Sequence, residues 1–120
     1  MLKIYIAGQM RGIPQYNYQE FMYAEQVLRD RGYMPINPVR MDKARGFDLL
    51  TLPASTDWHS FPPGMDMQET AMHCAREVIS ADGIYMLKSW RFSKGAQAEH
   101  AIADWLGKVI LYQENIRGQV

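Results

Sequence analysis

Segments with strand-like and helix-like patterns alternate along almost the whole chain, and this alternation constrains the fold most strongly. Four short apolar runs rich in β-forming residues are predicted to be buried strands: residues 2–7, 33–37, 83–87 and 108–112. Three segments between them repeat apolar side chains at helical spacing: residues 18–31, 67–80 and 94–106. Strands that alternate with helices imply right-handed crossovers, so we expect an α/β fold with a parallel sheet of four or five strands and helices on both faces.

Residues that commonly cap helices stand at the ends of these helical patterns. Asn17 and Ser93 directly precede two of them, and Gly32 and Gly107 directly follow. We therefore expect Asn17 and Ser93 to be N-caps. The tail after Gln113 has no such pattern, and we expect it to fray.

Residues 39–64 are the least regular part of the chain and contain several prolines and glycines. With 120 residues in all, we expect one domain that spans residues 1–120 and carries an irregular insertion at about 42–66. A long irregular segment in a compact domain is often functional, as a lid or an oligomer contact. A surface excursion with one short helix is the equally weighted alternative.

Composition excludes several classes of protein. The 13 basic and 13 acidic residues balance, so nothing indicates binding to a nucleic-acid polymer. No apolar run approaches the roughly 20 residues that span a bilayer, and the N-terminus is not that of a signal peptide, so we expect no membrane partner. Cys74 is the single cysteine, which suits a reducing cytoplasm.

The histidines do not form a metal-binding pattern with that cysteine. His59, His73 and His100 lack the spacing of a zinc site, so we expect no metal and no cofactor. A ligand site is expected elsewhere, because parallel α/β sheets bind ligands beyond the carboxyl ends of their strands. Three loops follow those ends: residues 8–16, the segment from Asn37 onward, and residues 88–95.

The loop at the third strand leads into a helix and is the most informative of the three. Ser93, Lys94 and Gly95 stand at the predicted helix start, where free N–H groups and the positive end of the dipole attract anions. Glu99 lies one turn further in, where we expect the dipole to keep it ionised and the fold to shield it partly. An ionised, oriented carboxylate can act as a covalent nucleophile. The alternative is that Ser93 only caps the helix and Glu99 is an ordinary acid of the first turns.

The loop after the first strand contains Gly8, Gln9, Met10 and Arg11, and resembles a short phosphate- or sugar-binding turn without matching a Rossmann or P-loop motif. Arg11 is a candidate for phosphate binding, or is simply solvated. Several aromatic residues could stack on a base or belong to the core, and Trp90 is the best candidate because of its loop position: Trp90, Tyr16, Tyr18 and Trp58. Trp105 fits the apolar side of its helix and is expected in the core.

Three motifs, in order, resemble the nucleoside 2-deoxyribosyltransferase superfamily, in particular its small phage and bacterial branch and the deoxynucleoside 5′-monophosphate N-hydrolases. They are the opening at residues 3–12, the pair Asn37-Pro38, and Ser93-x-Gly95-x-x-x-Glu99. The resemblance covers nearly the whole chain except residues 42–66. It implies a flavodoxin-like three-layer fold and cleavage of the N-glycosidic bond of a nucleoside or nucleotide, as a hydrolase or a transferase.

The resemblance also implies roles for individual residues. Glu99 would attack the anomeric carbon of the sugar, in the manner of a retaining glycosidase. Ser93 and Gly95 would bind the 5′-phosphate, and Gly8 with the residues that follow it would line the sugar and base pocket. Family members are oligomers, which implies a homodimer or homotetramer here, and the apolar insertion suits such a contact.

One departure from the family pattern bears on catalysis. Relatives carry an aspartate near the leaving base, on the helix before the third strand, where this chain has His73-Cys74. Either Asp57, Asp66 or His73 supplies the missing acid, or the enzyme is slow, or the protein only binds its ligand. The competing functions are therefore a non-catalytic nucleotide sensor and a phage accessory protein that binds a partner through residues 42–64.

Overall fold

The computed structural model describes residues 1–113, and their four strands form one parallel sheet. The strand order is β2-β1-β3-β4, the order of a flavodoxin-like sheet. The prediction of an α/β fold with a parallel sheet is confirmed. The expected fraying concerns residues 114–120, which lie outside the described part. The strands are β1 (Lys3–Ala7), β2 (Met34–Ile36), β3 (Gly83–Met86) and β4 (Val109–Tyr112).

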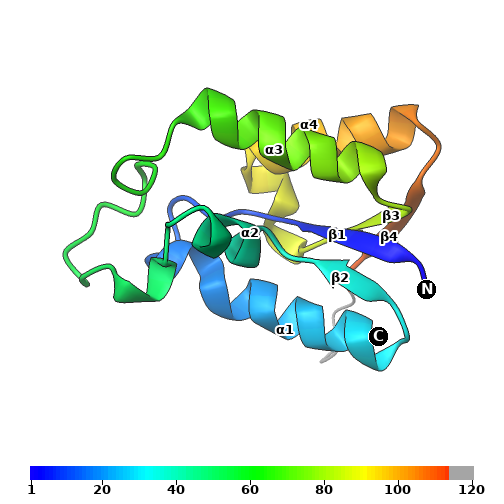
Figure 1. Ribbon diagram of the computed structural model, residues 1–120, viewed down its shortest axis with the longest axis horizontal. Helices are drawn as coiled ribbons and strands as arrows, with labels where there is room; N and C mark the ends of the chain where they lie inside the picture. The colour runs from blue at the N-terminus through cyan, green and yellow to red at the C-terminus, as the bar shows by residue number, and fades with distance from the viewer. Residues whose placement is uncertain (114–120) are drawn as a thin grey trace.

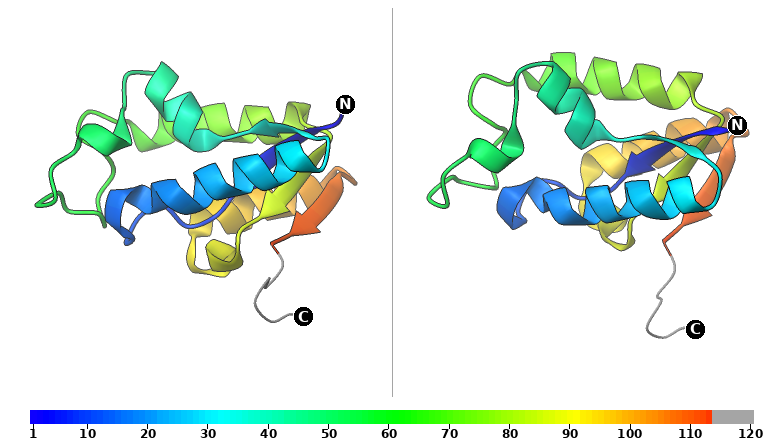
Figure 2. Two further views of the ribbon diagram at one scale, coloured as in Figure 1. Left: turned by 90° about the horizontal axis from the view of Figure 1, so that it is seen from below. Right: turned by 60° about the horizontal axis from the view of Figure 1, so that its bottom comes forward.

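Helices cover both faces of the sheet, which makes three layers (Figure 1, Figure 2). Helix α1 (Tyr18–Asp30) lies on one face, and α3 (Met67–Ser80) and α4 (Lys94–Trp105) lie together on the other. Strand β1 alternates between the two cores: Ile4 and Ile6 join the core on the α1 side, whereas Tyr5 and Ala7 join the core on the α3–α4 side. This alternation decides which side chains of β1 reach the α4 side.

Gly8 follows β1 directly and lies against the Leu87 side chain, where there is no room for a Cβ atom. A Cβ atom at Gly8 would lie 2.6 Å from the side chain of Leu87. Strands β1 and β3 are hydrogen-bonded up to this point, since Ala7 pairs with Met86 and the Leu87 amide donates to the Ala7 carbonyl at 2.8 Å. Packing at the carboxyl ends of the two central strands therefore requires a glycine at position 8, independently of any role in ligand binding.

Two helix starts differ from expectation. Asn17 does not cap α1: its φ of 63° is left-handed, and its amide donates to the Gln9 carbonyl at 3.0 Å instead. A helix missed by the periodicity, α2 (Pro38–Ala44), begins directly after β2, with Asn37 as its N-cap and proline at its first position. The seven residues of α2 are too few to show a clear helical period. Ser93 caps α4, as predicted.

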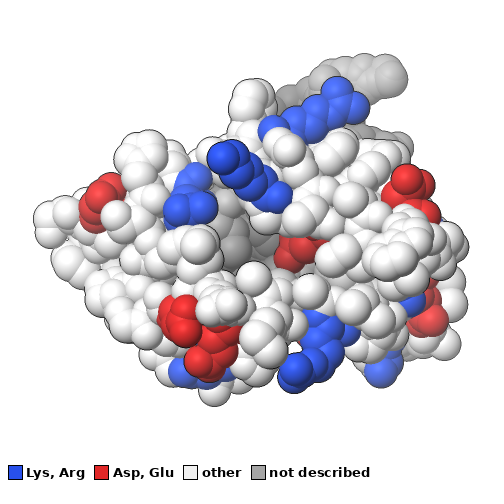
Figure 3. Space-filling model, turned by 90° about the horizontal axis from the view of Figure 1, so that it is seen from above, with Lys and Arg blue, Asp and Glu red and all other residues white. Residues whose placement is uncertain are grey.

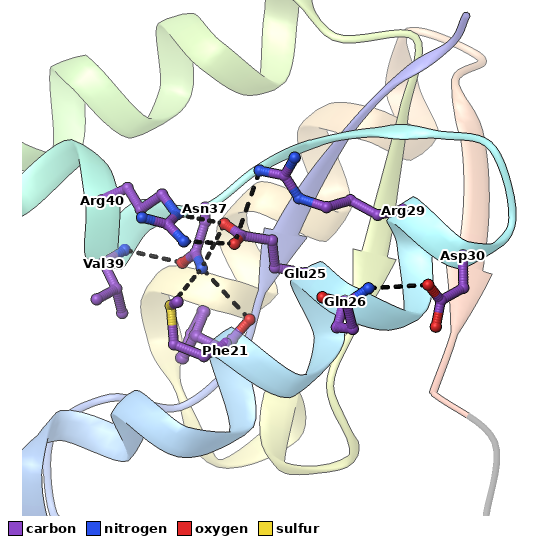
Figure 4. Close-up of polar contacts among 9 residues, drawn as sticks. Phe21, Glu25, Gln26, Arg29, Asp30, Asn37, Val39 and Arg40 are labelled. Atoms are coloured by element: carbon purple, nitrogen blue, oxygen red, sulfur yellow. Dashed lines mark hydrogen bonds and ion pairs between the residues drawn. The ribbon is translucent and has the colours of Figure 1, made fainter.

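Asn37 also ties α2 to α1 (Figure 4). Its side-chain amide donates to the Phe21 carbonyl and to Glu25 of α1, both at 3.3 Å, while its oxygen accepts from the Val39 amide. Glu25 is buried and receives two 2.7 Å hydrogen bonds from Arg40, which lower the pKa of its carboxyl. Asn37 therefore has a full set of structural contacts.

Residues 45–66 connect α2 to α3 and form the irregular excursion, with one short 3-10 helix, η2 (Leu49–Thr51). In Figure 1 this excursion extends to the left of the sheet. Of its apolar side chains, Leu49 is buried, and Leu52 and Trp58 pack against the core on the α1 side, whereas Leu50 is 48% exposed. The oligomer contact expected of this segment stays a prediction.

Trp105 is 83% exposed, so its expected place in the core is wrong. Ala103 is the residue of α4 that is fully buried against the sheet. Because successive helical residues are 100° apart, a side chain two positions further on points about 200° away.

Among the described residues, no helix is long and apolar enough to cross a membrane.

Candidate functional site

A cavity of about 420 Å³ lies beyond the carboxyl ends of β1 and β3. This is the switch point of the sheet, where β1 connects to one edge and β3 to the other, and where such folds bind ligands. Figure 3 shows a hollow with basic side chains at its rim on this side of the molecule. The lining consists of residues 5–11 and 92–96, together with Phe21, Pro38, Phe61, Cys74 and Glu99.

The start of α4 forms one wall of this cavity. The Ser93 hydroxyl accepts a hydrogen bond from the Ala96 amide at 3.1 Å, which fixes the first turn. Ser93, Lys94 and Gly95 all line the cavity, as does Arg11 from the opposite end of the sequence. The helix N-terminus and two cationic side chains make this part of the cavity suitable for an anion.

Glu99 lies one turn further along α4, in the same cavity. The hydroxyl of Tyr5, on β1, donates a hydrogen bond to its carboxyl oxygen at 2.8 Å. Burial raises the pKa of Glu99 to about 7, and the Tyr5 hydrogen bond opposes this rise. Desolvation thus outweighs the effect expected of the helix dipole, and the Glu99 carboxyl keeps its proton to a higher pH than an exposed glutamate does.

Tyr5 and Cys74 both keep their protons beside this carboxyl. Burial, followed by the charge of Glu99, raises the pKa of Tyr5 well above its ordinary value. The same two causes, in the same order, raise the pKa of the Cys74 thiol to about 11. Tyr5 is thus a stable hydrogen-bond donor to Glu99, and Cys74 is a neutral neighbour that neither attacks nor donates a proton readily.

The loop after β1 forms the opposite wall, with Gly8, Gln9, Met10 and Arg11. The Gln9 amide donates to the Ser89 hydroxyl at 3.1 Å, and the Gln9 side chain donates to the Arg11 carbonyl at 3.1 Å. The Arg11 guanidinium lies 4.2 Å from the centre of the Phe61 ring. This loop is therefore held both by the loop after β3 and by the excursion.

Two predicted binding residues do not line the cavity. Asn37 is occupied between α1 and α2, although its neighbour Pro38 reaches the cavity. Trp90 belongs to η3 (Lys88–Phe92), where a loop was expected, and its ring stacks on His100 of α4 with 4.4 Å between ring centres. Trp90 thus packs on α4 and against the core on the α3–α4 side of the sheet.

The three suggested substitutes for the family aspartate also lie elsewhere. Asp57 accepts hydrogen bonds from Ser60 and from the His59 amide within the excursion. Asp66 caps α3, and His73 lies beside Glu69. Cys74, in contrast, lines the cavity. Among the described residues that line it, Glu99 is the single carboxylate.

Several lining residues were not identified from the sequence. Tyr5 gave one usable signal: a hydroxyl in an otherwise apolar buried strand needs a polar partner. Phe61 and Phe92 gave none, because their positions depend on how irregular segments pack. No group of three or more His, Cys, Asp or Glu side chains suited to a metal ion is found among residues 1–113.

Comparison with known proteins identifies one family. The model of a family described as a domain of unknown function (DUF4406) matches residues 2–112, which is nearly the whole chain. The search of curated proteins and the search of solved structures find no match.

Proposed function

The chain belongs to the DUF4406 family, and we propose that it cleaves the N-glycosidic bond of a deoxynucleoside 5′-monophosphate, with Glu99 as nucleophile. The observation that supports this most strongly is the position of Glu99. Its carboxyl shares one cavity with the anion-attracting start of α4 and accepts a hydrogen bond from Tyr5. A phosphate at the helix start and a sugar beside the carboxyl would occupy adjacent parts of that cavity.

The reaction would follow two displacements at the anomeric carbon. In the first, an oxygen of ionised Glu99 forms a bond to this carbon while the bond to the base nitrogen breaks. The base leaves with the bonding electron pair and takes a proton from water. In the second, a water oxygen forms a bond to the same carbon while the bond to Glu99 breaks, and the proton that this water loses neutralises the hydroxide left by the first step. Glu99 returns as a carboxylate, and the product is the sugar phosphate. If another base attacks instead, the outcome is transfer.

The pKa of Glu99 sets the expected pH dependence. Because the nucleophile must be ionised, the rate rises with pH through a midpoint of about 7. Tyr5→Phe removes a hydrogen bond that lowers this pKa, so the midpoint of the variant moves to higher pH. An unchanged midpoint in Tyr5→Phe would contradict the assigned role of the Tyr5 hydroxyl.

The direct test is release of free base from a panel of deoxynucleoside 5′-monophosphates, measured by chromatography. Glu99→Gln keeps the size of the side chain and the hydrogen bond from Tyr5 but removes the nucleophile, so release falls at least about 10³-fold. Glu69→Gln, an exposed change on α3, is the matched control and retains full activity. Equal release by wild type and Glu99→Gln, or no release by wild type, refutes the catalytic proposal.

Nucleotide binding without turnover is the second candidate, and Cys74 is the observation that favours it. A neutral thiol with a pKa of about 11 lines the cavity, and no second carboxylate among the described lining residues is available to protonate the base. Calorimetry that shows nucleotide binding to wild type, with no base released after long incubation, would identify a sensor instead of an enzyme.

The compartment and assembly belong to the same proposal. A single cysteine suits a reducing cytoplasm, and we expect a homodimer or homotetramer. Light scattering on the full chain measures the assembly directly, and a monomeric mass would contradict it.

A further inference from the structure

Three phenylalanines line the cavity without a part in the proposed reaction: Phe21 belongs to the buried core, whereas Phe61 and Phe92 lie outside it. Phe61 comes from the excursion, and Phe92 comes from the end of η3, next to Ser93. They belong to segments that are 31 positions apart in the sequence (92 minus 61), yet they contribute to one binding surface. Their contacts indicate what that surface binds.

The part of the excursion that carries Phe61 is anchored to the loop after β1. The Gly12 amide donates to the Trp58 carbonyl at 2.7 Å, and the Tyr16 hydroxyl donates to the Ser60 carbonyl at 2.7 Å. The rings of Tyr16 and Trp58 meet edge to face, with 5.1 Å between their centres. Residues 58–60 are thus held by hydrogen bonds at both ends and by one ring contact, and Phe61 directly follows them.

Phe61 is also coupled to the anion-binding side of the cavity. The guanidinium of Arg11 lies 4.2 Å from the centre of its ring, within cation–π range. This contact holds Arg11 beside Phe61 in the lining of the cavity. A ligand that carries both a flat ring and an anionic group would contact the members of this pair together.

Phe92 is 80% exposed although it borders the cavity. It stacks on no aromatic ring in the described structure, whereas the adjacent Trp90 packs on His100. An exposed phenylalanine beside Ser93, at the border of a cavity with a carboxyl and a helix N-terminus, gives the cavity an apolar rim. Flat rings bind such surfaces by stacking, with little dependence on which base is present.

We propose that Phe61 and Phe92 form an aromatic subsite that binds the base of the nucleotide, so that the excursion supplies part of the base-binding surface. This inference rests on the proposed function, because it takes the ligand to be a nucleotide. Base selectivity is weak, since the ring contacts are apolar. The sugar and phosphate occupy the Glu99 and α4 parts of the cavity and do not depend on either ring.

The test compares two ligands by calorimetry in a Glu99→Gln background, which prevents turnover. One ligand is a deoxynucleoside 5′-monophosphate, and the other is 2-deoxyribose 5-phosphate, which lacks the base. Phe92→Ala and Phe61→Leu each weaken nucleotide binding by about 5- to 100-fold, the value of one base–aromatic stack, and change binding of the sugar phosphate by less than about two-fold. Since Phe92 is largely exposed, its replacement leaves the thermal midpoint unchanged.

Phe47→Leu is the matched control, because Phe47 lies in the same excursion and contacts an arginine, Arg45, but does not line this cavity. It leaves both affinities unchanged. Equal effects of the Phe92 and Phe61 variants on both ligands, or no effect on either, overturn the aromatic subsite while base release by wild type can still stand. Selective loss of nucleotide binding in a protein that never releases base supports the subsite and refutes the enzyme. A chain that binds neither ligand refutes both.

Discussion

The α4 wall of the cavity and the part of the excursion that carries Phe61 are ordered by different means. The α4 wall is built from regular elements: β1 and β3 are joined residue by residue, and α4 begins at a capped turn. Residues 58–61, of which Phe61 alone lines the cavity, have no regular structure and are held by two backbone carbonyls and one pair of aromatic rings. One region is thus fixed by repeating backbone hydrogen bonds, and the other by a few contacts between side chain and backbone.

In the proposed function, the reacting groups and the base-binding ring lie in these two different regions. Glu99 and Tyr5, which must keep a defined geometry, lie on a helix and a strand. Phe61, which only has to present a ring, lies on the excursion. Rigid elements hold reacting groups more accurately than loops do, whereas loops tolerate change and adapt to ligands.

We expect the largest difference in stability between the two regions when a glycine of each is replaced by alanine. At Gly83, on β3, an added Cβ would lie 2.7 Å from the Val109 carbonyl oxygen, so Gly83→Ala lowers the free energy of unfolding by about 2–3 kcal/mol. At Gly46, in the excursion, a Cβ has open space and only the φ of +98° opposes it, so Gly46→Ala costs about 1 kcal/mol. Urea unfolding measures both. A larger loss of unfolding free energy at Gly46 than at Gly83 would contradict the conclusion that the sheet is packed more tightly than the excursion.

The partly buried carboxyl of Glu99, on the α4 wall, should make stability depend on pH. Folding raises the pKa of Glu99 from 4.5 to about 7, so the folded chain holds a proton that the unfolded chain has lost, and stability falls as pH rises through this window. Glu99→Gln removes the effect. We expect the variant to match wild type at pH 4, below the unfolded pKa, and to be more stable at pH 8, by on the order of 1–3 kcal/mol.

Urea midpoints at the two pH values measure this difference. Glu69→Gln serves as the exposed control and shows no pH-dependent gain. A Glu99→Gln variant that is no more stable than wild type at pH 8 would show that the carboxyl is not desolvated by the fold.

The excursion should open independently of the sheet when one anchor is lost. Tyr16→Phe removes the hydrogen bond to the Ser60 carbonyl and costs about 1 kcal/mol of local stability, so proteolysis within residues 45–66 becomes about five-fold faster. Tyr23→Phe, at an exposed tyrosine of α1, is the control and cleaves at the wild-type rate. If Tyr16→Phe instead lowers global stability with no faster cleavage of the excursion, the excursion and the sheet unfold as one cooperative unit.

The smallest effect concerns Gly95, where stability and ligand binding should change in opposite directions. A Cβ at this position meets only the Ser93 hydroxyl oxygen, at 3.8 Å, so Gly95→Ala adds up to about 0.5–1 kcal/mol of stability through helix propensity. Because Gly95 lines the cavity, we expect the added methyl group to weaken nucleotide binding. Ala98→Gly, at an exposed position of α4, is the inverse control: it loses stability and keeps its affinity. Equal affinity in Gly95→Ala would show that no ligand approaches this backbone.

Patterns of apolar residues were sufficient to predict most of the architecture. The helix over residues 67–80 matches α3 at both ends, and Ser93 caps α4 as its residue type indicates. The short helix α2 was missed, although Asn37 followed by Pro38 is a helix-start signal. Asn17 shows the opposite error, since a suitable residue type at a helix start bonds to the Gln9 carbonyl instead.

The features of the candidate site can also be divided into those predictable from local sequence and those that depend on the folded chain. The α/β order, the parallel sheet and the placement of Glu99 one turn into a helix at the carboxyl ends of the strands could be predicted from the residues, because they follow from local periodicity and capping. The raised pKa of Glu99, its hydrogen bond from Tyr5 and the presence of Phe61 in the cavity could not be predicted and depend on the folded structure. Desolvation and contacts between distant segments depend on how the whole chain packs, and no short stretch of sequence encodes them.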